Sequence, residues 1–114
     1  MKIKNAFVFD VTEETFQEKV LAASELQPIV VDFWADWCPP CLVLAPVLEK
    51  VVGEYGGGLL LAKVEVDDNM RLAGQNKLRG FPTVILFKQG KELGRFSGAK
   101  PVSAVREFLD EHLA

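Results

Sequence analysis

The segment PIVVDFWADWCPPC, residues 28–41, limits the fold most strongly. β-Branched and aromatic residues dominate positions 28–35, and such residues favour a strand that is apolar on both faces. The consecutive prolines Pro39 and Pro40 then suit the first turn of a helix, where their missing N–H groups would have no intrahelical partner. The segment therefore predicts a buried strand that is followed directly by a helix.

The rest of the chain alternates strands and helices in the same way. The apolar pattern predicts strands at residues 6–9, 59–66, 83–87 and 92–96, and helices at 13–23, 39–55, 69–76 and 101–113. Thr12 is expected to cap the first helix, and the sequence KQGK around Gly90 is expected to form a hairpin turn. This order predicts an α/β fold whose central sheet is parallel in its first part and covered on both faces, with antiparallel strands added by the hairpin.

Length and charge restrict the class of protein. A chain of 114 residues suits one domain with its own core. The net charge of −3 argues against nucleic acid or a membrane surface as the main partner, because both require clustered cations. No apolar run approaches the ~20 residues of a membrane-spanning helix, and the run at 6–9 is too short for a secretory signal. We therefore expect a cytoplasmic protein.

Cys38 and Cys41 are the only two cysteines, and their spacing places both on one helix face, where a disulfide is permitted. The partial positive charge and free N–H groups at a helix N-terminus should lower the pKa of Cys38, while Cys41, one turn further in, should be more buried and less acidic. Cys38 would then attack a substrate disulfide, and Cys41 would release the substrate.

Two other readings of the cysteine pair are open. A static disulfide would close so short a loop that it would stabilise the fold little, and a reducing cytosol disfavours it. A zinc site needs four ligands, and beyond the cysteines the chain offers only the distant His112, so that a zinc-bridged dimer would be required. The redox reading is favoured over both.

The segments VDFWADWCPPC, KVEVD, RGFPT and FKQGKELGRFSGA together resemble the thioredoxin family along nearly the whole chain. The resemblance implies one thioredoxin-like domain over residues 1–114, with a central mixed five-stranded sheet flanked by four helices. It implies a protein-disulfide reductase with no bound cofactor and no metal, working as a monomer through its Cys38–Cys41 disulfide. The implied partners are disulfide-containing client proteins and an NADPH-dependent thioredoxin reductase.

The resemblance also assigns further site residues. Asp32 matches a buried acid beneath the cysteines, and Lys63 matches its neighbour on the next strand. Burial should raise the pKa of Asp32, so that it can take the Cys41 proton during resolution, although a purely structural Asp32–Lys63 pair is the alternative. The substrate-binding positions are Trp37, Pro39, Gly80, Phe81, Pro82 and Gly98. Pro82 is expected to follow a cis peptide bond.

Two positions depart from the family's usual motif. Pro39 replaces the glycine of CGPC, and Leu42 stands where a lysine is common. Both changes bear on recognition by a thioredoxin reductase. The alternative function is a thioredoxin-like protein-binding or co-chaperone module with weak or altered redox activity, a group that Leu42, Phe81 and the segment GAKPVSAVREFLDEHL also fit.

Overall fold

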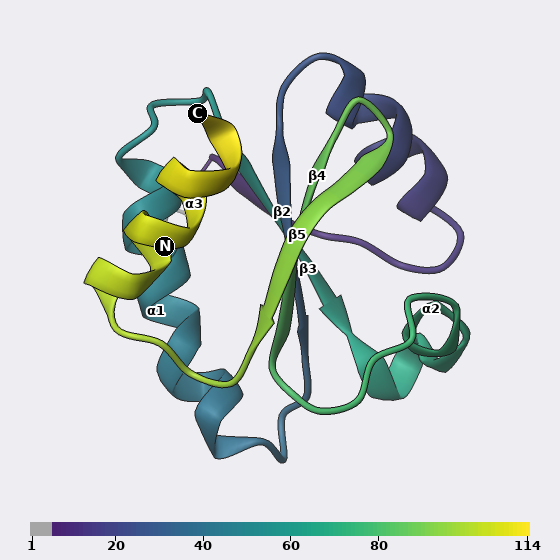
Figure 1. Cartoon of the computed structure of the whole chain (residues 1–114). Coiled ribbons are helices and arrows are strands. Elements are labelled where there is room, and N and C mark those ends of the chain that lie inside the picture. Colours follow the sequence, from purple (N-terminus) through teal and green to yellow (C-terminus); the bar gives the residue numbers. More distant parts are fainter. Residues whose placement is uncertain (1–5) are drawn as a thin grey trace.

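The computed structural model describes residues 6–114. Within this range one sheet has the strand order β1–β3–β2–β4–β5 (Figure 1). The strands are β1 (Val8–Asp10), β2 (Ile29–Trp34), β3 (Leu60–Glu65), β4 (Thr83–Lys88) and β5 (Lys91–Ser97). β1, β3 and β2 run parallel, whereas β4 pairs antiparallel with both β2 and β5. The predicted mixed five-stranded α/β sheet is confirmed.

Helices cover both faces of this sheet. Figure 1 shows α1 (Pro39–Gly53) and α3 (Val102–Leu113) on one face, and α2 (Met70–Gln75) with the helical residues 17–25 on the other. Neighbouring residues of β2 enter opposite faces, as strand side chains must: Val30 packs in the cluster under α1 and α3, and Val31 in the other. Among the described residues, no helix combines the length and the apolar character needed to cross a membrane.

The first helix begins later than predicted and is not an α-helix. Residues 13–15 form a turn, followed by a π-helix at Gln17–Ala22 and a 3₁₀ turn at Ala23–Glu25. Phe16 and Val20, four residues apart in the sequence, are both buried, as apolar residues on one helical face should be. The apolar spacing therefore located the buried face but not the type of helix.

Hydrogen bonds explain why Thr12 does not act as the predicted cap. The Thr12 N–H donates to Thr15 Oγ1 at 3.0 Å, and the Thr15 N–H donates to the Thr12 carbonyl. The Glu13 N–H donates to Asn69 Oδ1 at 2.9 Å, across the gap to the start of α2. These bonds close a turn at residues 12–15, and the helical residues follow it.

Other element boundaries differ from the predictions by one or two residues. β1 begins at Val8 rather than at residue 6, and α1 ends at Gly53 rather than near residue 55. The hairpin turn is confirmed: Gln89 and Gly90, its two central residues, have φ angles of 53° and 75°. Positive φ at both central residues is the geometry that suits the twist of a two-residue hairpin.

His112, near the end of α3, packs against β5 instead of lying in solvent. It is half-buried, its Nδ1 lies 2.8 Å from the Phe108 carbonyl oxygen, and its ring packs on the Phe108 ring. The imidazole also fills the space that a side chain at Gly94 of β5 would need. Gly94 therefore permits close approach of α3 to the sheet, which the sequence pattern of α3 alone does not reveal.

The strand register brings the candidate site residues to one end of the sheet. Phe33 of β2 pairs with Thr83 of β4 in antiparallel orientation. Residues that follow β2 must therefore lie beside residues that precede β4. This places Cys38, four residues after β2, at the same end as Pro82, one residue before β4.

Candidate active site

Cys38 and Cys41 form a disulfide at the start of α1, with their Cα atoms 5.3 Å apart. Cys38 is the N-cap of the helix, as predicted, and its sulfur accepts a hydrogen bond from the Cys41 N–H at 3.3 Å. Pro39 and Pro40 occupy the first two helical positions and have no N–H to offer. The Cys41 amide is thus the first donor of the helix, and it is shared between the Cys38 carbonyl, at 3.0 Å, and the Cys38 sulfur.

Both cysteines are buried in this oxidised state. Cys38 is 4% exposed and Cys41 1%, so the predicted order of burial is confirmed by a narrow margin. Burial alone therefore distinguishes the two sulfurs poorly. The stronger asymmetry is electrostatic, because only Cys38 stands at the helix terminus with an amide donor on its sulfur, an arrangement that favours thiolate over thiol.

Asp32 is the buried acid predicted from the sequence. Its side chain is 1% exposed, and Oδ2 lies 3.7 Å from the Lys63 Nζ, across the register that pairs these two residues of β2 and β3. That distance is too long for a hydrogen bond, so the ion pair offsets the cost of burial only in part. Burial raises the pKa of Asp32 from 3.8 to about 6, Lys63 opposes the rise, and the negative charge of Glu49 adds to it.

Lys63 connects this buried carboxylate to the surface. Its side chain is 15% exposed, and its Nζ lies 5.2 Å from the centroid of the Trp34 ring, a cation–π contact. Lys63, Trp34 and Asp10 also line a pocket of about 330 Å³ on the β1 side of the sheet. A carboxyl group that titrates near neutral pH, with a cation beside an open pocket, is suited to exchange protons during a reaction.

The predicted substrate positions near β4 lie together. The Phe81–Pro82 peptide bond is cis, as the resemblance implied. The Gly98 N–H donates to the Pro82 carbonyl at 2.9 Å, and the Thr83 hydroxyl donates to the Gly80 carbonyl at 2.6 Å. Gly98 has a φ of 87°, a conformation that favours glycine. The ends of β4 and β5 thus form one continuous edge beside the disulfide end of the sheet.

Trp37 joins this edge to the cysteine motif. Trp37 is 60% exposed, and its ring meets the Phe81 ring edge to face with centroids 6.1 Å apart. Pro39, on the other side of Cys38, is also exposed. Uncharged side chains therefore flank the redox sulfur on both sides.

The sequence interpretation missed two residues that act on the site. Asp67, in the 3₁₀ turn after β3, accepts a hydrogen bond from Trp37 Nε1 at 2.8 Å and fixes the indole. Its position just past a parallel neighbour of β2 is a signal that was available, since the carboxyl ends of such strands meet. Glu49 of α1 acts on Asp32 through space, and only the packing of the helix on the sheet reveals it.

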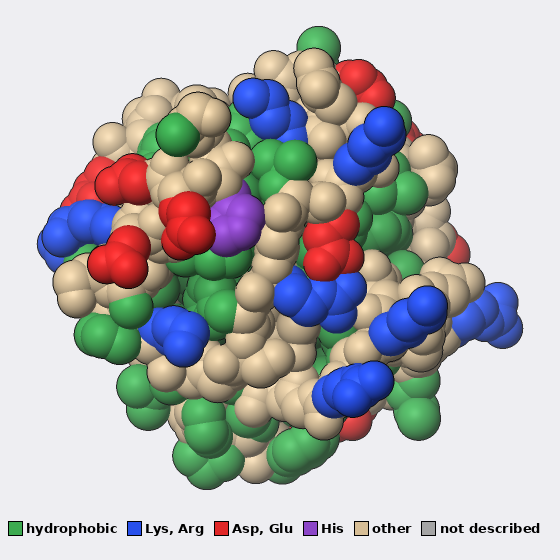
Figure 2. Space-filling model, viewed as in Figure 1, with side chains coloured by type: hydrophobic (Ala, Val, Ile, Leu, Met, Phe, Trp, Pro, Cys, Tyr) green, Lys and Arg blue, Asp and Glu red, His purple; other side chains and the backbone are tan. Residues whose placement is uncertain are grey.

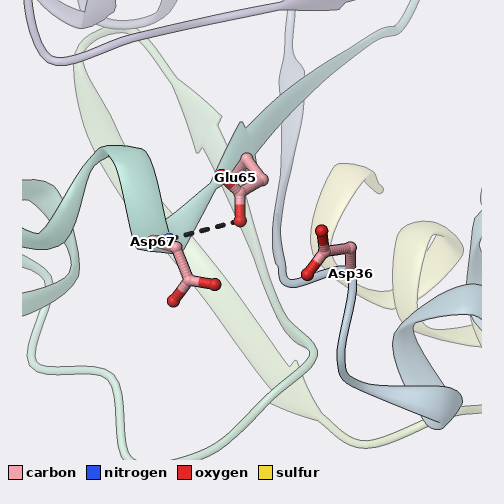
Figure 3. A group of neighbouring side chains, drawn as sticks. All are labelled: Asp36, Glu65 and Asp67. Atoms are coloured by element: carbon pink, nitrogen blue, oxygen red, sulfur yellow. Dashed lines mark hydrogen bonds between the residues drawn. The ribbon is translucent and has the colours of Figure 1, made fainter.

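Asp36, Glu65 and Asp67 form an acidic group next to Trp37 (Figure 3). One carboxylate oxygen from each lies within 4.8 Å of the others, and the Asp67 N–H donates to Glu65. Partial burial and the neighbouring Asp68 raise the pKa of Glu65. Oxygen ligands suit Ca²⁺ or Mg²⁺ rather than zinc, and two of the three side chains are exposed, so we assign no metal to this group.

Comparison with known proteins agrees with this geometry. The thioredoxin family model matches residues 7–111, from the residue before β1 almost to the end of α3. Thioredoxin 2 of Chlorobaculum tepidum is 40% identical over 105 residues, which cover 92% of this chain and 94% of that protein. The thioredoxin of Acidithiobacillus ferridurans is 41% identical, and thioredoxin 1 of Nostoc sp. is 38% identical, each over 103 residues that cover 90% of this chain and 94% of the relative.

Proposed function

Because this chain belongs to the thioredoxin family, it is a protein thiol–disulfide oxidoreductase, and we propose that it works as a reductant of disulfides in client proteins. The redox group is the Cys38–Cys41 disulfide itself, and members of the family need no bound cofactor. The observation that carries the proposal is that the sulfur of the N-cap residue Cys38 accepts a hydrogen bond from the Cys41 amide, which that amide shares with the Cys38 carbonyl. Such a sulfur is stabilised as the thiolate, the form that attacks disulfides.

The proposed reaction transfers two electrons from the reduced protein to the client. The Cys38 thiolate attacks one sulfur of the client disulfide, so that a bond between Cys38 and the client forms and the first client thiolate leaves. Cys41 then gives up its proton and attacks the Cys38 sulfur, which forms the Cys38–Cys41 disulfide and releases the second client thiolate. Each leaving thiolate takes up a proton from solvent or from a neighbouring acid.

We assign the Cys41 proton to Asp32. Asp32 is two residues after Val30 on β2, so its side chain enters the same face of the sheet as Val30, the face that α1 covers, and Cys41 belongs to the first turn of α1. With a pKa of about 6, Asp32 is ionised at neutral pH and can accept a proton there. Lys63, whose Nζ lies 3.7 Å from Asp32 Oδ2, would balance the negative charge of the carboxylate before the proton is transferred. The client chain itself would lie along the edge formed by Trp37, Phe81, Pro82 and Gly98.

The remaining assignments follow from the reductant role. We propose that residues 1–114 act as one domain and as a monomer in the cytoplasm, where reduced thiols are maintained. Electrons would come from an NADPH-dependent thioredoxin reductase, which must accommodate Pro39 and Leu42. Nucleic acid and membranes are not proposed as partners. No observation on residues 6–114 favours the alternative of a protein-binding or co-chaperone module with weak or altered redox activity.

The reductant role is tested by the reduction potential of the Cys38–Cys41 pair, measured at equilibrium with glutathione buffers. We expect a value within or below the cytosolic glutathione range of about −220 to −260 mV, so that electrons flow from the protein to client disulfides. Turnover of insulin disulfides with NADPH and a thioredoxin reductase provides the second readout. A potential near the ~−120 mV of strong periplasmic oxidants would instead identify a protein that introduces disulfides.

A further inference from the structure

An apolar stripe begins directly beside the redox sulfur. Pro39, Leu42 and Val43 stand at positions i, i+3 and i+4 of α1 and therefore share one face of the helix. Leu42 is 53% exposed and Val43 63%. The Leu42 N–H donates to the Cys38 carbonyl at 3.3 Å, which places Leu42 one helical turn from the cysteine that caps the helix.

No charge interrupts this stripe. Along α1 the first charged residue is Glu49, two turns beyond Leu42. Figure 2 shows hydrophobic side chains gathered along the lower edge of the molecule, where Figure 1 places the start of α1. Leu26, which is 89% exposed, lies before β2 and therefore at the opposite end of the sheet from Cys38. The stripe is thus a distinct feature of the disulfide end.

The chemistry of the site determines what covers this stripe. Cys38 is 4% exposed, and an exchange reaction requires a client sulfur to reach bonding distance of its sulfur, about 2.05 Å. The client segment must therefore lie against the exposed neighbours of Cys38. On the helix side these neighbours are Pro39, Pro40 and Leu42, so the stripe continues the surface on which the reaction takes place.

We propose that Leu42 and Val43 form a specificity-determining subsite that binds an apolar side chain of the client beside its disulfide. A charged client side chain would lose water against this surface and would find no opposite charge on the first three turns of α1. The subsite therefore selects clients by disfavouring charge as well as by contacting apolar groups. The inference rests on the proposed function in one respect, namely that the substrate is a polypeptide disulfide.

The test compares disulfide peptides that differ at one position next to the target cysteine, which holds leucine, glutamate or lysine. For the wild-type protein we expect kcat/KM for the leucine peptide to exceed that for the glutamate peptide by about tenfold. Leu42→Lys should remove this preference or reverse it in favour of glutamate. Val43→Lys should act in the same direction. Leu26→Lys is the matched control, because Leu26 is 89% exposed and remote from the disulfide, and it should leave the preference unchanged.

Three outcomes would overturn the subsite. In the first, Leu42→Lys keeps the wild-type peptide preference, as Leu26→Lys does. In the second, Leu42→Lys slows reduction of the small disulfide cystine as strongly as that of the peptides. In the third outcome, Leu42→Lys alters only turnover of the reductase and leaves peptide preference intact. Exchange with the same peptides also runs in the oxidising direction, so the preference is measurable even if the potential contradicts the reductant role.

Discussion

Replacing Cys38 with serine is expected to reduce turnover of insulin disulfides by at least about a thousandfold. The variant retains Cys41, but that thiol lies one turn inside α1 and is not the N-cap of the helix. Cys41→Ser is the matched variant, because it keeps the attacking sulfur and removes only the second step. It should form a mixed disulfide with the client and then stop. Insulin precipitation measures turnover, and mass spectrometry of the quenched reaction detects the trapped adduct.

The two variants distinguish the roles of the sulfurs as well as their importance. The expected pattern is no adduct with Cys38→Ser and a stable adduct through Cys38 with Cys41→Ser. If Cys38→Ser kept most of the wild-type turnover, or if the adducts formed through Cys41, the assignment of attacker and resolver would be wrong. Loss of turnover in both variants without any adduct would indicate that the cysteine pair is structural.

Replacing Asp32 with asparagine is expected to stabilise the protein at pH 7 by up to about 3 kcal/mol. Burial raises the pKa of Asp32 from 3.8 in the unfolded chain to about 6 in the folded protein. The folded state therefore binds this proton more tightly, and the free energy of unfolding falls as the pH rises from about 4 to about 6. Asparagine carries no charge at any of these pH values, so this decrease in the free energy of unfolding should be absent from the variant.

The same substitution should slow the resolving step. Above pH 6 the Asp32 carboxylate is available to accept the Cys41 proton, and asparagine is not. We expect single-turnover release of the client from the mixed disulfide to be slower by about a hundredfold near neutral pH. Below pH 6 the wild-type acid is itself protonated, so the difference between the two proteins should shrink.

Urea unfolding at several pH values measures the stability effect, and rapid-quench kinetics measure the resolving step. Asp110→Asn is the control, since it makes the same change on the exposed face of α3. Greater stability with unchanged kinetics would leave Asp32 a structural role only. A variant no more stable than the control at pH 7 would contradict the raised pKa itself.

Local chemistry made much of this fold predictable from the sequence. Pro39 and Pro40 located the start of α1 to the residue, because prolines at those positions allow few alternatives. Gly90 marked the hairpin, because its turn requires positive φ. The buried acid Asp32 and its contact with Lys63 were expected from the family resemblance, and the strand register places the two residues side by side.

The predictions failed where distant segments decide local structure. Asn69 binds the Glu13 amide in the turn that precedes the first helix, and Gly94 leaves room for His112 against the sheet. Neither effect is encoded in the periodicity of the affected segment. For Asp67, its place after β3 indicated the correct end of the sheet, but its contact with the indole of Trp37, thirty residues earlier in the chain, appears only in the folded structure.

The most direct test of the enzyme's asymmetry is the rate at which each thiol of the reduced protein is alkylated by iodoacetamide as a function of pH. Peptide mapping follows Cys38 and Cys41 separately. A sulfur at the N-cap that receives an amide hydrogen bond should react at lower pH than a free cysteine, and Cys41 should react only at higher pH. Identical pH profiles for the two thiols, with Cys38 no more reactive than cysteine in an unfolded peptide, would contradict the mechanism.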